Sequence, residues 1–174
     1  SASGAAIAAG AGSSAISPDG RRVVFIGSDS AGRQGLWIQE LDQVRARFLA
    51  ETEGATYPFW GPDSRRVGFF AKGKLRRVAL DDGRVEPICD AIEGRGGSWG
   101  SAGTIVFAGS VTGPVAAVAA DGGAPRAVTA IENPEEEISH RFPAFLPDGQ
   151  QFLYLADPGT GGEEGAVYLA SLAG

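Results

Sequence analysis

The sequence has no methionine, one cysteine and one histidine. A lone cysteine excludes a disulfide within the chain, and one histidine with one distant cysteine cannot build a zinc site. No apolar run approaches the length of about 18 residues that a membrane helix needs, and the glycine-rich phosphate-binding motifs are absent. We therefore predict no metal, no cofactor and no membrane span in this chain. Because there is no initiator methionine, we expect the chain to be a processed product or a segment of a longer polypeptide.

Positive charge is also scarce. Lysine and arginine number 15 against 21 aspartate and glutamate residues, which gives a net charge of -6 and a pI near 4.8. Because nucleic-acid binding needs a basic face, we predict no nucleic-acid partner. Basic side chains do gather between Arg65 and Arg77, where solvated turn and strand-edge positions are favoured and an anionic docking patch is the alternative. Cys89 follows two apolar residues, so we expect burial rather than reactivity.

Glycine is abundant, and one short phrase recurs. The chain has 27 glycines and 10 prolines, which indicates many tight turns between short strands. The phrase is I-S-P-D-G at residues 16–20, W-G-P-D-S at 60–64 and L-P-D-G at 146–149, and a β-rich run follows each copy. With Ser101 in a degraded third copy, the turns recur about every 40 residues, which is the length of a four-stranded propeller blade.

These repeats predict an all-β fold, a β-propeller of four blade-length, four-stranded antiparallel repeats. We expect the repeats at residues 13–50, 56–90, 96–130 and 140–174, within a propeller domain that spans residues 16–174. Residues 1–15 form an alanine- and glycine-rich segment. The fourth repeat ends one strand short, so we expect residues 4–9 to pair beside 166–171. This closing strand would complete a four-bladed ring within one chain, or an eight-bladed dimer if two chains exchange it. The bulky inner strands favour the homodimer.

The recurring turn has a chemical explanation. Proline presets φ, the aspartate carboxylate accepts backbone N–H bonds, and glycine takes the left-handed position that closes the turn. We therefore assign structural turn roles, rather than catalytic ones, to eight residues: Pro18, Asp19, Gly20, Pro62, Asp63, Pro147, Asp148 and Gly149.

One catalytic pattern occurs, because G-G-S-W-G at residues 96–100 fits the G-x-S-x-G nucleophile elbow. That elbow needs a helix after the serine, whereas Ser98 is expected to begin an inner strand. The only histidine, His140, lies at the start of another expected inner strand. We expect it to hydrogen-bond to a neighbouring repeat, and a pH-responsive group or ligand is the alternative. A serine hydrolase is therefore not favoured, and we predict no catalytic residues.

Two acidic segments are candidates for recognition. The first, residues 132–137, includes Glu132 and Glu137 and lies between the third and fourth repeats. The second is the glycine-rich hairpin at residues 157–165, with Asp157, Glu163 and Glu164. Both are interpreted as solvated insertions, because neither has the alternating ligands of a calcium loop. An insertion on a rigid scaffold is nevertheless a common place for recognition.

The repeats also resemble a known family. The phrases S-P-D-G-R-R-V-V-F and W-G-P-D-S-R-R-V-G-F-F resemble TolB-like propeller repeats. With G-A-T-Y-P-F-W at 54–60, G-R-G-G-S-W at 94–99 and S-H-R-F-P-A-F-L-P-D-G at 139–149, they look like the propeller that follows the kinase domain and membrane helix in certain bacterial eukaryotic-like serine/threonine kinases. The resemblance covers residues 15–173. It implies a non-catalytic sensing or scaffold role on the extracytoplasmic, periplasmic side.

We therefore expect a binding or sensing module that takes a protein or a small ligand at one mouth of the propeller, where inner-strand ends converge. Two alternatives stay open. The first is that the chain is the gating propeller of a prolyl-oligopeptidase-like hydrolase. The second is that it is an element whose purpose is self-assembly.

Overall fold

The computed structural model describes residues 6–7, 12, 14–159 and 165–173, and strands are its only regular elements. The strands form four antiparallel sheets, each built from consecutive segments of the chain. This confirms the all-β prediction. Alternating and continuous apolar runs separated by glycine turns leave no segment long enough for a helix.

The first two sheets each contain a complete four-stranded meander. The first has the order β2 (Ser14–Ile16), β3 (Arg22–Ser28), β4 (Gln34–Glu40) and β5 (Arg47–Phe48). The second has the order β6 (Thr56–Trp60), β7 (Arg66–Ala71), β8 (Lys74–Ala79) and β9 (Val85–Asp90). Each P-D-G or P-D-S turn therefore joins the first strand of a sheet to the second.

The last two sheets repeat this plan with one difference. The third has the order β10 (Gly97–Trp99), β11 (Thr104–Phe107), β12 (Ala116–Ala119) and β13 (Arg126–Ala127). The fourth has the order β14 (Ser139–Phe145), β15 (Gln151–Asp157) and β16 (Ala166–Ser171). Within the described residues the fourth sheet has three strands, as its truncated pattern predicts.

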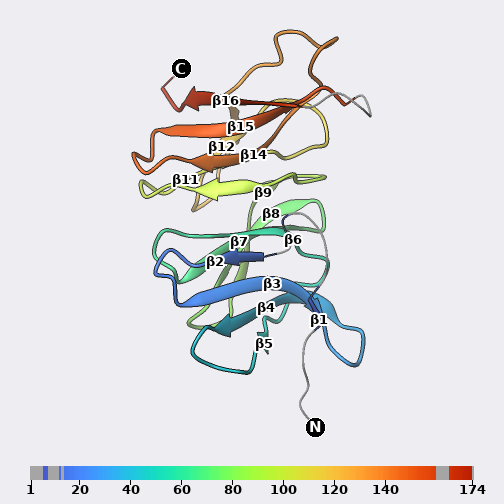
Figure 1. Cartoon of the computed structure of the whole chain (residues 1–174), viewed down its shortest axis with the longest axis vertical. Coiled ribbons are helices and arrows are strands. Elements are labelled where there is room, and N and C mark those ends of the chain that lie inside the picture. Colours follow the sequence, from blue (N-terminus) through green and yellow to red (C-terminus); the bar gives the residue numbers. More distant parts are fainter. Residues whose placement is uncertain (1–5, 8–11, 13, 160–164, 174) are drawn as a thin grey trace.

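The four sheets lie face to face in sequence order. The first strands of successive sheets are neighbours, so that β2 contacts β6, β6 contacts β10 and β10 contacts β14. In Figure 1 the sheet of β3 and β4 lies at one end of the long axis, and β15 and β16 lie at the other end. The array is therefore an open arc of propeller blades. Closure into a four-bladed ring, one of the two forms expected from the sequence, is not detected in the described residues.

The N-terminal strand also pairs differently from the expectation. β1 (Ala6–Ile7) pairs with the end of β3, with Ala6 opposite Ser28 and Ile7 opposite Gly27. It does not lie beside 166–171, and the rest of the expected 4–9 strand falls outside the described residues. The reason is local, since β2 covers only the first half of this edge of β3 and leaves the second half to be paired. An unpaired half-edge close by in the chain is easier to reach than one at the far end of the array.

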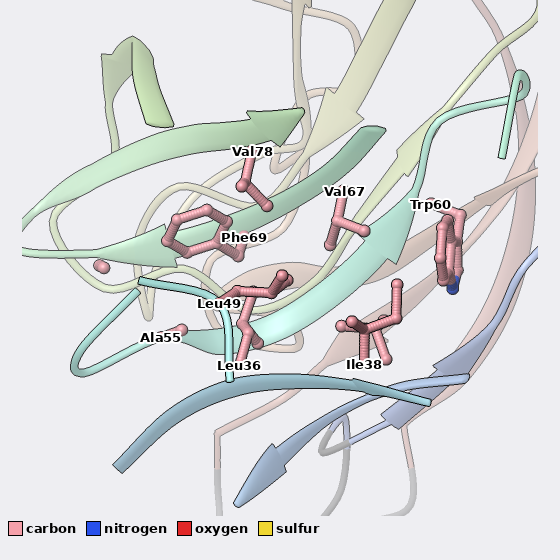
Figure 2. Packing of buried hydrophobic residues seen from close by; sticks show 10 residues of the cluster. Leu36, Ile38, Leu49, Ala55, Trp60, Val67, Phe69 and Val78 are labelled. Carbon is pink, nitrogen blue, oxygen red and sulfur yellow. The ribbon is translucent and has the colours of Figure 1, made fainter. Parts of the chain in front are cut away.

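The core consists of three apolar layers, one between each pair of adjacent sheets. Figure 2 shows the first layer, in which Leu36 and Ile38 of the first sheet face Val67 and Phe69 of the second. A second layer joins the second and third sheets, and a third joins the third and fourth. Full burial of each such side chain contributes about 1.5–3 kcal/mol, so these layers set the spacing and order of the sheets.

We predict that Phe69→Ala destabilises the chain by about 3–5 kcal/mol, because Phe69 is completely buried and its loss leaves a cavity in the first layer. Urea unfolding followed by circular dichroism measures the change. Val44→Ala is the matched control, since Val44 is 97% exposed and its truncation should have little effect. A loss below about 1 kcal/mol for Phe69→Ala would contradict the layered core.

Candidate functional site

The inner strands of all four sheets end at a common concavity, which we call the mouth groove. Its volume is about 490 Å³, and its lining comes from the ends of β2, β6, β10 and β14 and from the turns that follow them. None of the lining side chains is charged, and the set includes Ile16, Pro18, Trp60, Pro62, Trp99 and Pro147. An apolar concavity where several elements converge is the usual form of a binding site.

The P-D-G turns at this mouth share one geometry. In the first, the N–H of Gly20 donates to the Ser17 carbonyl over 2.8 Å, and Gly20 has a φ of 69°. Asp19 Oδ1 accepts the N–H of Arg21 at 3.0 Å. In the last, Asp148 Oδ1 accepts the backbone N–H groups of Gln150 and Gln151, each at 2.9 Å. These bonds use the carboxylate as a backbone acceptor within the turn.

The two middle turns are variants of this geometry. Asp63 Oδ1 accepts the N–H of Arg65 at 2.9 Å, and Ser64 takes the left-handed position with a φ of 57°. In the third repeat, which has neither proline nor aspartate, the N–H of Gly103 still donates to the Gly100 carbonyl at 3.1 Å, and Gly103 has a φ of 82°. The positive φ and the closing bond are therefore the common elements.

The hydrogen bonds of the turns shift the titration of their carboxyl groups. The backbone N–H groups of Gln151 and Gln150 lower the pKa of Asp148. For Asp19, the Ser17 hydroxyl and then the Arg21 N–H lower the pKa. At Asp63 burial raises the pKa, but the hydrogen bonds from Arg65 and Arg66 outweigh burial, so the pKa of this carboxyl group is lowered. Hydrogen bonds of this kind favour the ionised form of each carboxyl group.

Bonds between repeats also converge on the mouth groove. The indole N–H of Trp60 donates to the Ala15 carbonyl of the first repeat at 2.9 Å. The Arg66 guanidinium of the second repeat lies 5.6 Å from the centroid of the Trp99 ring in the third. The N–H of Phe145 in the fourth repeat donates to Ser98 Oγ in the third at 3.1 Å. Each adjacent pair of repeats is therefore joined at this surface.

Ser98 and His140 do not form a catalytic pair. Ser98 Oγ accepts the Phe145 N–H at one end of β14, whereas His140 lies near the other end. Their partners Phe152 and Ala156 are four residues apart on β15, which corresponds to about 13 Å along an extended strand. No helix follows Ser98 in the described residues, so the nucleophile-elbow geometry is not present there. The structure thus does not bring together the residues that a serine hydrolase needs.

His140 instead joins the third and fourth repeats, as the sequence predicts. Its ring is 1% exposed, with Nδ1 2.7 Å from Thr129 Oγ1 and Nε2 3.2 Å from Glu137 Oε2. Thr129 Oγ1 also accepts the N–H of Val115 at 2.9 Å. Both ring nitrogens of His140 therefore have a hydrogen-bond partner, one in the third repeat and one in the segment that leads to the fourth, and the direction of each bond depends on the tautomer.

Two inner strands contain an unusual aromatic bulge. Tyr57 in β6 and Phe142 in β14 have φ values of 48° and 51°, at points where the strand register shifts. Bulky side chains rarely adopt this conformation, which costs about 1–3 kcal/mol. The bulges turn the two rings toward each other, with 5.8 Å between centroids. Gly96 in the third repeat has a φ of 95°, and a Cβ there would lie 3.0 Å from Phe142.

The remaining candidates have ordinary surroundings. Cys89 is half-buried, and burial, aided by the charge of Asp90, raises the pKa of its thiol to about 11. Four of the six basic side chains between Arg65 and Arg77 form ion pairs, as in the bonds from Arg77 to Glu86 and Asp121. Asp157 pairs with Arg141, whereas Glu163 and Glu164 lie outside the described residues.

Residues 132–136 of the acidic segment are exposed, as expected for a solvated insertion, and Glu137 is half-buried. Glu132, Glu136 and Glu137 line a second groove beside β16, which the sequence analysis did not detect. Within the described residues, no group of three or more histidine, cysteine, aspartate or glutamate side chains is arranged to hold a metal ion. The described part of the chain also contains no helix with the length and apolarity needed to cross a membrane.

Solved structures share this architecture. TolB from Agrobacterium tumefaciens superposes with a TM-score of 0.76 at 16% identity, over 90% of this chain and 60% of that chain. TolB from Acinetobacter baumannii gives a TM-score of 0.71 at 14% identity, over 92% of this chain and 41% of that one. An acylaminoacyl peptidase from Pyrococcus horikoshii gives a TM-score of 0.61 at 16% identity, over 90% of this chain and 30% of that chain.

The likeness establishes the fold. The chain has the β-propeller architecture of TolB-like proteins, which confirms the resemblance of its repeats to TolB-like repeats. It spans about three fifths of the first of these neighbours and less of the others. No protein-family model and no curated protein matches the sequence.

We predict that the chain loses stability in acid, in part through Asp148. Because its folded pKa lies below the unfolded value of about 4, the contribution of Asp148 is complete above that pH and is lost as the pH falls toward the folded pKa. Asp148→Asn keeps an oxygen acceptor but cannot titrate in this range. The drop in unfolding free energy between about pH 5 and pH 3 should therefore be smaller in the variant, as measured by urea unfolding. An identical drop in both proteins would contradict this role.

Proposed function

We propose that this chain is a non-catalytic binding and sensing module of a larger bacterial protein, and that it binds a protein or a small ligand at the mouth groove. The observation that carries the proposal is the convergence of four inner strands on one uncharged concavity of about 490 Å³. The TolB-like fold supports a protein-interaction role, whereas sensing and the identity of the ligand are proposals.

The lining of the mouth groove suits an apolar anchor. Trp60 and Trp99 form a buried base for the groove, and Ile16 at its rim is 66% exposed. Rigid aromatic surfaces with a nearby exposed aliphatic side chain resemble the hot spots of protein interfaces. The repeats hold these side chains in place through bonds such as that from Trp60 to Ala15, so little ordering is needed on binding.

The setting of the module is part of the proposal. The phrases that resemble the propeller of bacterial serine/threonine kinases support a kinase-associated sensor on the extracytoplasmic side. A gating propeller of a prolyl-oligopeptidase-like hydrolase is the second candidate, supported by the likeness to the Pyrococcus horikoshii acylaminoacyl peptidase. The gene sequence flanking this segment distinguishes them, because it encodes a kinase domain in the first case and a hydrolase domain in the second.

We predict that Ile16→Glu weakens binding at the mouth groove. A random peptide library displayed on phage is selected on the immobilised chain, and the affinities of the selected peptides are measured by fluorescence anisotropy. A buried charge opposite an apolar anchor should weaken binding at least about tenfold. Val44→Glu introduces the same charge at a site that is 97% exposed and outside the lining of the groove, so it should leave the affinity unchanged. Peptides that bind both variants equally would contradict the proposal.

Self-assembly is a third candidate, and the end of the array favours it. Leu153, Val167 and Leu169 are 38%, 66% and 56% exposed on the face of the fourth sheet opposite the third apolar layer. A second copy packed on this face would continue the array, as in the eight-bladed dimer.

We predict that the chain dimerises at micromolar concentration, because Leu153, Val167 and Leu169 leave an apolar face of the fourth sheet exposed. Sedimentation velocity measures the mass. Val167→Lys should shift the equilibrium toward the monomer, whereas Val44→Lys should not. A strict monomer of 17.8 kDa for the unaltered chain would contradict the dimer.

A further inference from the structure

His140 is the only histidine of the sequence, and histidine is the side chain whose ordinary charge change falls between pH 5 and 8. The single thiol titrates elsewhere, because burial and then the charge of Asp90 raise the pKa of Cys89 to about 11. The ring of His140 is 1% exposed, so a proton that binds it charges a buried group. A response of the folded chain to mild acid therefore has one main source among its side chains.

Both partners of the His140 ring can accept a hydrogen bond. Nδ1 lies 2.7 Å from Thr129 Oγ1 of the third repeat, and Nε2 lies 3.2 Å from Glu137 Oε2. A hydroxyl oxygen has two lone pairs, and the N–H of Val115 uses one of them on Thr129 at 2.9 Å. The second lone pair stays available to Nδ1–H, and the Glu137 carboxylate accepts from Nε2–H. The ring can thus carry a proton on each nitrogen without losing either bond.

A threonine in the first repeat shows what the histidine replaces. Thr52 Oγ1 accepts the N–H of Leu36 at 2.9 Å, at the start of the third strand of its repeat, as Thr129 Oγ1 does in the third repeat. The Thr52 hydroxyl donates to the Leu49 carbonyl at 2.5 Å, within the same repeat. At Thr129 the ring of His140 is the partner instead. A bond that is fixed in the first repeat is therefore titratable between the third and fourth.

The acidic segment places negative charge next to the ring. The Glu137 side chain is 19% exposed, and its Oε1 accepts the N–H of Glu132 at 3.1 Å, which brings a second acid close. The basic neighbour in β14, Arg141, is neutralised by an ion pair with Asp157 of β15. The sum of these charges around His140 is negative, so they favour a positive ring.

The strands on the other side of the ring contribute aromatic groups. Tyr154 of β15 has its ring centroid 4.4 Å from that of His140, and Tyr168 of β16 stacks on Tyr154 at 5.8 Å. Burial, and after it the charge of Glu137, raises the pKa of Tyr154, so this phenol carries no charge in mild acid. An aromatic face at this distance attracts a cation.

We propose that His140 is a pH-sensitive latch, whose protonation in mild acid turns its bond to Glu137 into an ion pair and fixes residues 132–137 against the seam between the third and fourth repeats. Opposite charges at this distance, with little exposure to water, add an attraction that a neutral ring lacks. At higher pH the ring is neutral and the segment is held more weakly. The latch lies near the end of β14 opposite the mouth groove, so its action does not require a ligand there.

The test begins with the unaltered chain. Its single histidine gives one set of ring ¹⁵N signals, so NMR reports the protonation of His140 without ambiguity. We expect the ring to gain its second proton between pH 7.5 and pH 5.5 while the chain stays folded. Amide exchange at Glu132, Glu136 and Glu137, whose N–H groups are bonded within the segment, should slow about two- to fivefold beyond the intrinsic effect of pH. A ring that stays neutral to pH 5.5, or exchange that follows the intrinsic effect alone, overturns the latch.

Matched variants separate the latch from a fixed structural contact. Glu137→Gln keeps an acceptor but removes the charge, so its unfolding constant relative to that of the unaltered chain should rise about two- to fivefold from pH 7.5 to pH 5.5. The sign follows from linkage, because a proton held more tightly by the folded chain stabilises it at low pH and this contribution is lost as the pH rises. Glu135→Gln, at an exposed site of the same segment, should show a constant ratio in the same urea experiments. The slowing of amide exchange should also disappear in Glu137→Gln. A ratio for Glu137→Gln that does not change with pH rules out the latch.

Discussion

The structure depends on the packing of sheets that are apolar on both faces. β7 shows this, since Val67 and Phe69 enter the layer toward the first sheet and Phe70 enters the layer toward the third. A strand of this kind is stable only between two neighbours. Each sheet therefore requires the next one, and the array continues until a sheet has a face that can stay exposed or is covered by something else. The fourth sheet still has an apolar face that no other sheet covers, with Val167 and Leu169 exposed in the described residues.

The two candidate surfaces arise from this packing at different radii. Because the inner strands are neighbours, every turn phrase arrives at the same mouth, and apolar side chains accumulate there without any charge. The outer strands diverge instead, and a groove opens where the fourth sheet has three strands in the described residues. The groove at the inner strands has no charged lining side chain, whereas the outer groove is lined by Glu132, Glu136 and Glu137. One scaffold thus presents two chemically distinct surfaces.

Local sequence patterns predicted the turn-and-strand units well, because each signal lies within a few residues. The β-rich run expected after each of the three turn phrases is β3, β7 or β15 in the structure. Contact of His140 with the neighbouring repeat was also predicted, and its bond to Thr129 confirms it. The groove beside β16 was missed, because its walls come from residues 128–137, 151–158 and 165–171, which no local pattern connects. The left-handed Tyr57 and Phe142 were missed too, since nothing in their types predicts a positive φ.

The sequence by itself determined the strands, the turns and their number of repeats, because proline, aspartate and glycine act on the dihedrals and bonds of their own turn. Only the tertiary structure decided which edges and faces meet. β1 pairs with β3, and not beside Ala166–Ser171, and the four sheets form an open arc instead of a closed ring. The physical reason is that a strand edge carries the same backbone groups everywhere and an apolar face accepts any apolar neighbour, so the choice between partners depends on their distance and curvature in space.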